Sequence, residues 1–165
     1  MTVALRPARP LDAGTLGALI TQAVAAHEWK PNLHSAAEDI AHAGTLIERG
    51  WVTVACDDTD HPLGFIARED AYVHALFIAE GTRGRGVGRA LLADAKRASA
   101  RLELWTFQDN QGAQRFYERQ GFEMTERTDG AGNEEGLPDV HYVWQRKARP
   151  KAPPPAPAPS EEAQP

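Results

Sequence analysis

Glycine and arginine are concentrated in one short stretch of this chain, and together they are suited to binding an anion. From Ile78 to Leu92 the sequence reads I-A-E-G-T-R-G-R-G-V-G-R-A-L-L. Glycine tolerates positive φ and lets another molecule approach the backbone, and a helix start offers unpaired N–H groups and the positive end of a dipole. Guanidinium groups match the geometry of phosphate. The stretch is therefore predicted to bind phosphate or pyrophosphate.

Spacing separates the nucleotide-binding motifs that this loop could represent. A P-loop counted from Gly81 fails because Val87 stands where the motif needs lysine. The dinucleotide fingerprint counted from Gly84 fails because Arg89 stands where it needs glycine. The spacing that does hold is Arg83-x-x-Gly86-x-Gly88. A solvated glycine-rich turn that binds nothing stays open on this stretch alone.

Two strand–helix pairs must position this loop and the residues opposite it. The segment Tyr72–Ile78 alternates as a strand, with its even-numbered residues expected on one face, and a helix with apolar residues at three- and four-residue spacing follows the loop. Leu102–Phe107 is the second strand, and its helix carries Phe116 and Tyr117 before Gly121 ends it. The other expected elements are strands at Thr2–Leu5, Trp51–Cys56, Leu63–Arg68, Phe122–Thr128 and Val140–Gln145, a helix with its apolar face from Leu16 to Val24, a helix from the Ser35/Glu38 capping box to Gly50, and a polar loop at Asp129–Asp139.

Composition predicts one soluble domain, at residues 1–147, followed by a tail. The 165 residues carry 18 Lys and Arg against 23 Asp and Glu, a net charge of −5, which makes nucleic acid an improbable partner and suits a cationic ligand. Seven of the 12 prolines lie between Pro150 and Pro165, so residues 148–165 are predicted to be a disordered Pro-rich tail.

Cysteine and hydropathy patterns limit the other classes of site. Cys56 is the only cysteine and is predicted to be a buried structural thiol. His27 and His34 lie outside any HExxH pattern, so no metal site is expected. Without a leader-like segment or an apolar run of membrane-spanning length, we expect a cytoplasmic protein without membrane contact.

Two stretches of the sequence resemble signatures of the Gcn5-related N-acetyltransferase (GNAT) superfamily. Arg83-x-x-Gly86-x-Gly88 looks like its acetyl-CoA loop, and Trp105–Phe122 is similar to its N-x-x-A-x-x-F-Y-x-x-x-G-F signature. The order of expected elements, β-α-α-β-β-β-α-β-α-β-β, resembles the superfamily across residues 2–146. The resemblance implies an α/β (α+β) fold with a mixed, mostly antiparallel sheet of about seven strands, about four flanking helices and a V-shaped cleft between two splayed central strands.

The resemblance also implies an enzyme that moves the acetyl group of acetyl-CoA to a primary amine by direct attack, without a metal. Tyr117 matches the tyrosine that commonly protonates the departing thiolate, although it could simply pack on an apolar stripe. A backbone N–H near Leu76–Ile78 would polarise the thioester carbonyl. The residues that would bind acetyl-CoA are Leu76, Phe77, Ile78, Arg83, Gly84, Arg85, Gly86, Val87, Gly88, Arg89, Asn110 and Phe116.

An amine with a pKa of about 10 must lose a proton before it attacks, so a general base or a water chain is expected. His74, on the strand beside the acetyl group, is our leading candidate, and a packing role is its alternative. Glu28, Glu69, Asp70 and His141 stay open as other candidates.

Acidic residues before the last strand predict a cationic small-molecule acceptor. Glu134, Glu135 and Asp139 would attract its ammonium groups, and Trp29 and Trp105 would reach the same mouth. A solvated acidic loop is an equal alternative. A protein lysine or N-terminus as the acceptor, a catalytically silent acyl-CoA-binding module, and a homodimer formed through edge strands also stay open.

Overall fold

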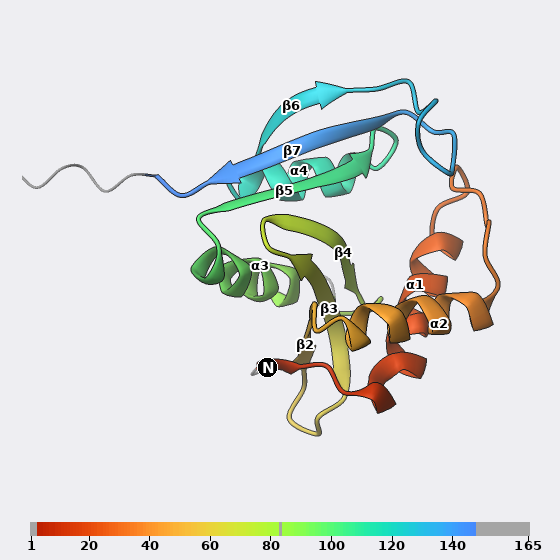
Figure 1. Cartoon of the computed structure of the whole chain (residues 1–165), viewed down its shortest axis with the longest axis vertical. Coiled ribbons are helices and arrows are strands. Elements are labelled where there is room, and N and C mark those ends of the chain that lie inside the picture. Colours follow the sequence, from red (N-terminus) through yellow and green to blue (C-terminus); the bar gives the residue numbers. More distant parts are fainter. Residues whose placement is uncertain (1–2, 83, 148–165) are drawn as a thin grey trace, which may run out of the picture.

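The computed structural model describes residues 3–82 and 84–147, so Arg83 and the predicted tail at 148–165 lie outside the described residues. Figure 1 shows the order of the elements along the chain. They are β1 (Ala4–Pro7), the 3-10 helix η1 (Pro10–Asp12), α1 (Ala13–Ala25), α2 (Ala36–Glu48), β2 (Val52–Cys56), β3 (Pro62–Glu69), β4 (Tyr72–Ile78), α3 (Val87–Ala98), β5 (Arg101–Phe107), α4 (Gln111–Arg119), β6 (Glu123–Arg127) and β7 (Asp139–Gln145).

The described strands form one mixed sheet in the order β1-β2-β3-β4-β5-β7-β6, and among them only β4 and β5 are parallel. This pair is joined only at its start. Tyr72 lies opposite Glu103, whose N–H donates to the carbonyl of Ala71 at 2.8 Å. Toward Ile78 and Phe107 the described strands form no further ladder. The splayed strands predicted by the resemblance are therefore present.

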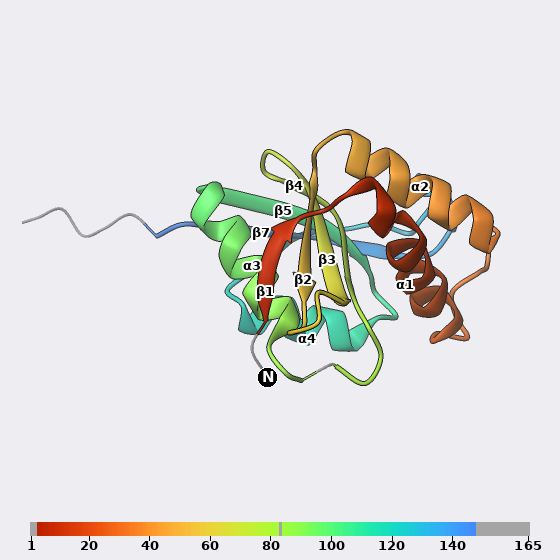
Figure 2. The same ribbon diagram turned by 90° about the horizontal axis from the view of Figure 1, so that it is seen from below.

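Helices cover both faces of the sheet and enclose two apolar clusters. Figure 2 shows α1 and α2 on one side of the sheet and α3 on the other. The α1–α2 side buries Leu16 and Phe65, whereas the side of α3 and α4 buries Leu91 and Tyr142. The helices α1 and α2 cross closely at Gly17, where a Cβ would lie 2.6 Å from an Ile40 atom. The predicted fold is confirmed.

A β-bulge in β4 changes which side chains share a face. Val73 and Ala75 lie opposite consecutive residues of β3, so His74 is an extra residue in β4. Val73 consequently packs in the same cluster as Leu76 and Ile78. The prediction that His74 shares a face with Leu76 and Ile78 is wrong, because strict alternation takes no account of the extra residue.

Local signals located the elements well and their ends less well. The Ser35/Glu38 capping box is present, with the Glu38 N–H donating to Ser35 Oγ at 3.1 Å. The described part of the first strand is Ala4–Pro7, Thr2 lies outside the described residues, and β6 is shorter at both ends than predicted. Cys56 is buried as predicted, and burial raises the pKa of its thiol. The described helices include none with the length and apolarity needed to cross a membrane.

Candidate active site

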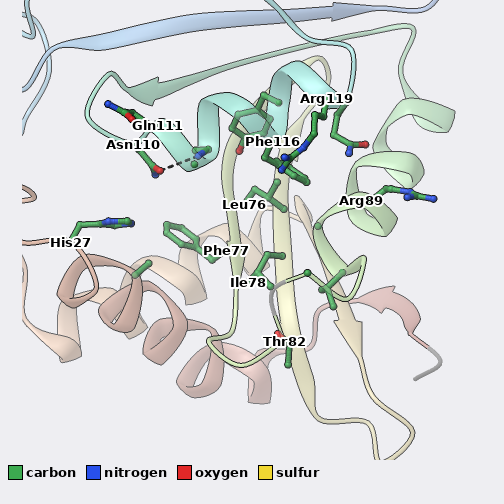
Figure 3. Close-up of a pocket in the computed structure, with 18 of the residues that line it drawn as sticks. His27, Leu76, Phe77, Ile78, Thr82, Arg89, Asn110, Gln111, Phe116 and Arg119 are labelled. Atoms are coloured by element: carbon green, nitrogen blue, oxygen red, sulfur yellow. Dashed lines mark hydrogen bonds between the residues drawn. The ribbon is translucent and has the colours of Figure 1, made fainter.

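The cleft between β4 and β5 holds a cavity of about 720 Å³, which we call the β4–β5 cavity. Figure 3 shows its walls, formed by the end of β4, the glycine loop, the start of α3 and the helix α4. This volume is within the range of about 300–1,000 Å³ typical of cofactor and small-molecule sites. The predicted cofactor-binding residues that line it are Leu76, Phe77, Ile78, Gly84, Gly86, Val87, Gly88, Arg89, Asn110 and Phe116. Arg85 is outside this lining, and Arg83 is outside the described residues.

One edge of β4 offers backbone groups to the cavity. The strand pairs with β3 along its length but with β5 only at Tyr72, so the edge from Leu76 to Ile78 has no strand partner in the described structure. Amide-bearing chains bind such an edge as an added strand would, through main-chain hydrogen bonds. The end of β4 is therefore suited to holding an extended ligand that contains amide groups.

The glycine loop closes the cavity at the start of α3. Gly84 and Gly86 have φ values of 80° and 82°, in the left-handed region, and Gly86 is the residue before the first turn of α3. The helix begins at Val87, so its unpaired N–H groups and the positive end of its dipole lie in this wall beside Arg89. The arrangement fits a pyrophosphate, as the sequence predicts.

The opposite wall is α4, whose start is fixed by Asn110. The Asn110 Oδ1 accepts a hydrogen bond from the Ala113 N–H at 3.1 Å and so caps the helix (Figure 3). Phe116 lies close to α3, since a Cβ added to Gly88 would be 3.1 Å from the end of its ring. The sequence signature predicted the position of Asn110 in this wall but not its capping role.

Tyr117 lines the same cavity from an apolar surrounding. Its side chain is buried, and its ring packs edge-on against Phe116 and Phe122 at centroid distances of 5.3 and 5.5 Å. Burial strongly raises the pKa of the Tyr117 phenol, because the apolar site disfavours the phenolate. The hydroxyl is protonated at neutral pH, as that of an ordinary tyrosine is, and the raised pKa extends this to higher pH.

A second cavity of about 560 Å³ adjoins the first, and we call it the acid-lined cavity. Lys30 and Phe77 line both cavities, so the two share a wall. The titratable residues around the second cavity are Lys30, the carboxylates Glu38, Asp39, Glu134 and Glu135, and the imidazoles His34, His42 and His74. Its charge is predominantly negative, which suits a cationic ligand.

His74 belongs to the acid-lined cavity and not to the β4–β5 cavity. Its Nε2 lies 3.0 Å from Glu69 Oε1, and its ring stacks on Trp51 with centroids 4.6 Å apart and planes inclined by 3°. Tyr72 meets the same ring edge-on at 4.6 Å. A carboxylate and two aromatic rings thus fix the orientation of the imidazole beside the second cavity.

The predicted acceptor-binding residues divide into two groups. Glu134 and Glu135 line the acid-lined cavity, whereas Trp29, Trp105 and Asp139 are absent from both linings in the described structure. Trp29 packs against Phe107, and Trp105 packs against His141. Asp139, at the start of β7, accepts a hydrogen bond from Asn133 of the β6–β7 loop. Among the other candidate bases, Glu69 contacts His74, while Glu28, Asp70 and His141 line neither cavity.

The segment between α1 and α2 contributes His34, which was not among the predicted site residues. His34 Nε2 lies 2.8 Å from Glu134 Oε1 and its Nδ1 lies 3.4 Å from Glu38 Oε2, so it joins the start of α2 to the loop between β6 and β7. These carboxylates raise the pKa of His34. The His34–Glu38 spacing of four residues was a readable signal, but the contact with Glu134 depends on the fold. Within residues 3–82 and 84–147, no cluster of His, Cys, Asp and Glu is arranged to hold a metal ion.

Comparison with known proteins identifies the family to which this site belongs. A family model described as an acetyltransferase (GNAT) domain matches residues 48–124. The peptidyl-lysine N-acetyltransferase YjaB of Salmonella typhimurium is 30% identical over 131 residues, which cover 78% of this chain and 89% of that protein. The chain belongs to the GNAT family of acetyltransferases.

Two further comparisons agree with GNAT membership. An uncharacterized N-acetyltransferase of Methanocaldococcus jannaschii is 37% identical over 91 residues, 46% of this chain, and this match spans only 40% of that protein. The solution structure of apo-form YjaB from Escherichia coli matches with a TM-score of 0.75 and 25% identity, over 89% of this chain and 100% of that chain. The predicted family, fold and acyltransferase class are therefore confirmed.

Proposed function

We propose that this GNAT protein transfers the acetyl group of acetyl-CoA to a primary amine of a small cationic molecule. The observation that carries the proposal is the junction of two cavities of different chemistry, which share Lys30 and Phe77. One has a glycine loop, a helix start and a free strand edge, and the other has four carboxylates. A donor with phosphates and an acceptor with ammonium groups would meet at the shared wall.

The residues of the β4–β5 cavity fit acetyl-CoA. The N–H groups at the start of α3, together with Arg89, would bind the pyrophosphate, and the free edge of β4 from Leu76 to Ile78 would bind the amides of the pantetheine arm. The left-handed conformations of Gly84 and Gly86 support this fit, because side chains there would strain the loop. Acetyl-CoA supplies an activated acetyl group as its thioester.

His74 would remove the proton from the incoming amine. The imidazole lies in the wall of the acid-lined cavity, where Glu69 orients it and would stabilise the imidazolium that forms. A primary amine attacks only when it is neutral, and an amine that is cationic at neutral pH needs such a base. Glu134 and Glu135 would hold the other ammonium groups of a cationic acceptor.

Tyr117 would return a proton on the donor side. Tyr117 lines the β4–β5 cavity, and burial disfavours its phenolate form. Protonation of the departing thiolate makes it a better leaving group and prevents it from attacking the new amide. The two proton-transfer groups would thus act from different cavities, His74 on the nitrogen and Tyr117 on the sulfur.

A lysine side chain of a protein is the second candidate acceptor. The similar YjaB proteins carry the name peptidyl-lysine N-acetyltransferase. A lysine ammonium would suit the same carboxylates as a small cation, so the acid-lined cavity supports both acceptors. The two acceptors differ in what carries the amine, which is a polypeptide chain in one case and a small molecule in the other.

An acceptor panel tests the proposal. Thiol release from acetyl-CoA, with mass analysis of the acceptor, would be measured with polyamines, aminoglycosides, amino acids and lysine peptides at equal concentration. We expect turnover with polyamines or aminoglycosides and slower turnover with neutral amino acids. Turnover with lysine peptides alone would replace the small molecule by a protein acceptor. Tight binding of acetyl-CoA without turnover by any amine would favour the silent acyl-CoA-binding module.

A further inference from the structure

The lysine in the wall shared by the two cavities is a nucleophile that the proposed reaction does not use. Lys30 lies between α1 and α2, and its side chain lines both the β4–β5 cavity and the acid-lined cavity. Its Nζ is 5.5 Å from the centroid of the Phe107 ring, at the end of β5. Lys30 therefore brings an amine of the protein itself to the wall that the β4–β5 cavity and the acid-lined cavity share.

The surroundings of Lys30 favour its reactive, neutral form. Burial lowers the pKa of its ammonium group, and the carboxylates of Glu135 and Asp39 oppose part of this effect. Among the described residues, no salt bridge ties the Lys30 Nζ to a carboxylate. The amine is thus easier to deprotonate than that of a solvated lysine.

We propose that Lys30 is a self-acetylation site, which the enzyme acetylates when the acid-lined cavity holds no acceptor. This rests on the proposed function, because acetyl-CoA must occupy the β4–β5 cavity. The Nζ lone pair forms a bond to the thioester carbonyl carbon, and the bond between that carbon and sulfur breaks. One proton passes from nitrogen to sulfur, so that lysine and acetyl-CoA become Nε-acetyl-lysine and coenzyme A.

A second role for Lys30 would be to bind an anionic group of the acceptor. The four carboxylates of the acid-lined cavity make an anionic acceptor unfavourable there, so the charge of the cavity argues against this role. The two roles differ in their products, since only self-acetylation leaves a covalent mark on the protein.

Two other lysines are internal controls for acetylation by simple chemistry. Burial also lowers the pKa of Lys96, but its Nζ donates to the Gln120 carbonyl at 2.6 Å and lies over the Trp144 ring, outside both cavity linings. Lys147 is exposed and follows β7. Neither lysine lines the β4–β5 cavity or the acid-lined cavity.

The test is to incubate the full-length protein with acetyl-CoA, without acceptor, and to follow acetylation by intact mass and peptide mapping. We expect one acetyl group at Lys30, acquired at least roughly ten-fold faster than at Lys147, because bound reactants react faster than free ones. A polyamine should suppress the labelling. Lys30→Arg, which keeps the positive charge, should abolish it, and Tyr117→Phe should slow it at Lys30 but not at Lys147.

Two further measurements on the same preparation distinguish a failure of self-acetylation from a failure of the proposed function. They are calorimetric binding of acetyl-CoA and turnover of an added amine. If both are normal but Lys30 is labelled no faster than Lys147, self-acetylation is wrong and the proposed function stands. If acetyl-CoA does not bind, both proposals are wrong. Labelling of Lys30 that Tyr117→Phe leaves unchanged would mean that the enzyme's own chemistry is not responsible, which would also overturn the inference.

Discussion

Tyr117 lines the β4–β5 cavity, and its apolar surrounding disfavours the phenolate. Tyr117→Phe removes only the hydroxyl and retains the ring contacts with Phe116 and Phe122. We expect turnover to fall roughly 10²-fold or more, the usual contribution of a general acid, with little change in the affinity for acetyl-CoA. Steady-state thiol release and calorimetric titration measure the two quantities.

Tyr142→Phe is the matched control for this prediction. Tyr142 lies in the same apolar cluster, with its ring 6.2 Å from that of Tyr117, but its hydroxyl donates to Glu118 outside the cavity lining. Its loss should reduce the free energy of unfolding and leave turnover near that of the wild type. Equal losses of turnover in both variants would remove Tyr117 from the mechanism.

The lowered pKa of Lys30 predicts how the rate of its acetylation depends on pH. Because burial lowers this pKa, half of the Lys30 amines are neutral at a pH below the ordinary lysine value of 10.5. The rate of Lys30 acetylation should therefore rise with pH and level off below pH 10.5. Rates from peptide mapping across a pH series measure this profile, and a rise that continues beyond pH 10.5 would refute it.

The conformation of the glycine loop before α3 can be tested with two matched glycine-to-alanine variants. Gly86 and Gly50 have φ values of 82° and 76°, and a Cβ at either would meet no atom within 4 Å. Alanine at each should cost about 1–2 kcal/mol of stability through backbone strain alone. Only Gly86→Ala should weaken the binding of acetyl-CoA, because only Gly86 lies in the loop of the cleft. Chemical denaturation and calorimetry measure the two effects, and equal affinities would separate the loop from donor binding.

At the scale of elements, the sequence was informative wherever the signal was local. The capping box at Ser35, the glycine loop and the helix that carries Phe116 and Tyr117 could be predicted because nearby residues determine them. The bulge at His74 could not, since it depends on the register between β3 and β4. That one extra residue moves His74 from the expected donor cleft to the acid-lined cavity.

The acid-lined cavity is a property of the whole molecule, because α1, the α1–α2 loop, α2, β4 and the β6–β7 loop all contribute to its lining. His34, Glu38 and Glu134 come from the α1–α2 loop, the start of α2 and the β6–β7 loop. Glu134 and Glu135 could be proposed from their charge alone, whereas their meeting with His34 and Lys30 required the fold. The residue types of three other positions suggested a role in acceptor binding, but the fold places them outside both cavity linings. These are Trp29, Trp105 and Asp139.

Removing negative charge from the acid-lined cavity should weaken the binding of the acceptor more than that of acetyl-CoA. The double variant Glu134→Gln with Glu135→Gln should raise the KM for a polyamine roughly ten-fold or more, because two ion pairs with the acceptor would be lost. Its control is Glu123→Gln with Glu126→Gln on the exposed strand β6, which changes the net charge equally but lies outside both cavities. Steady-state kinetics with the two variants test the idea. An unchanged KM in the first variant, or equal changes in both, would contradict recognition by Glu134 and Glu135.

The most direct measurement is a crystal structure of the protein with coenzyme A and a polyamine. We expect the pyrophosphate on the loop from Gly84 to Arg89, the pantetheine arm along the free edge of β4, and its sulfur beside Tyr117. The nearest amine of the polyamine should lie in the acid-lined cavity near His74 and Lys30. Coenzyme A bound away from the β4–β5 cavity, or a polyamine bound outside the acid-lined cavity, would contradict the account.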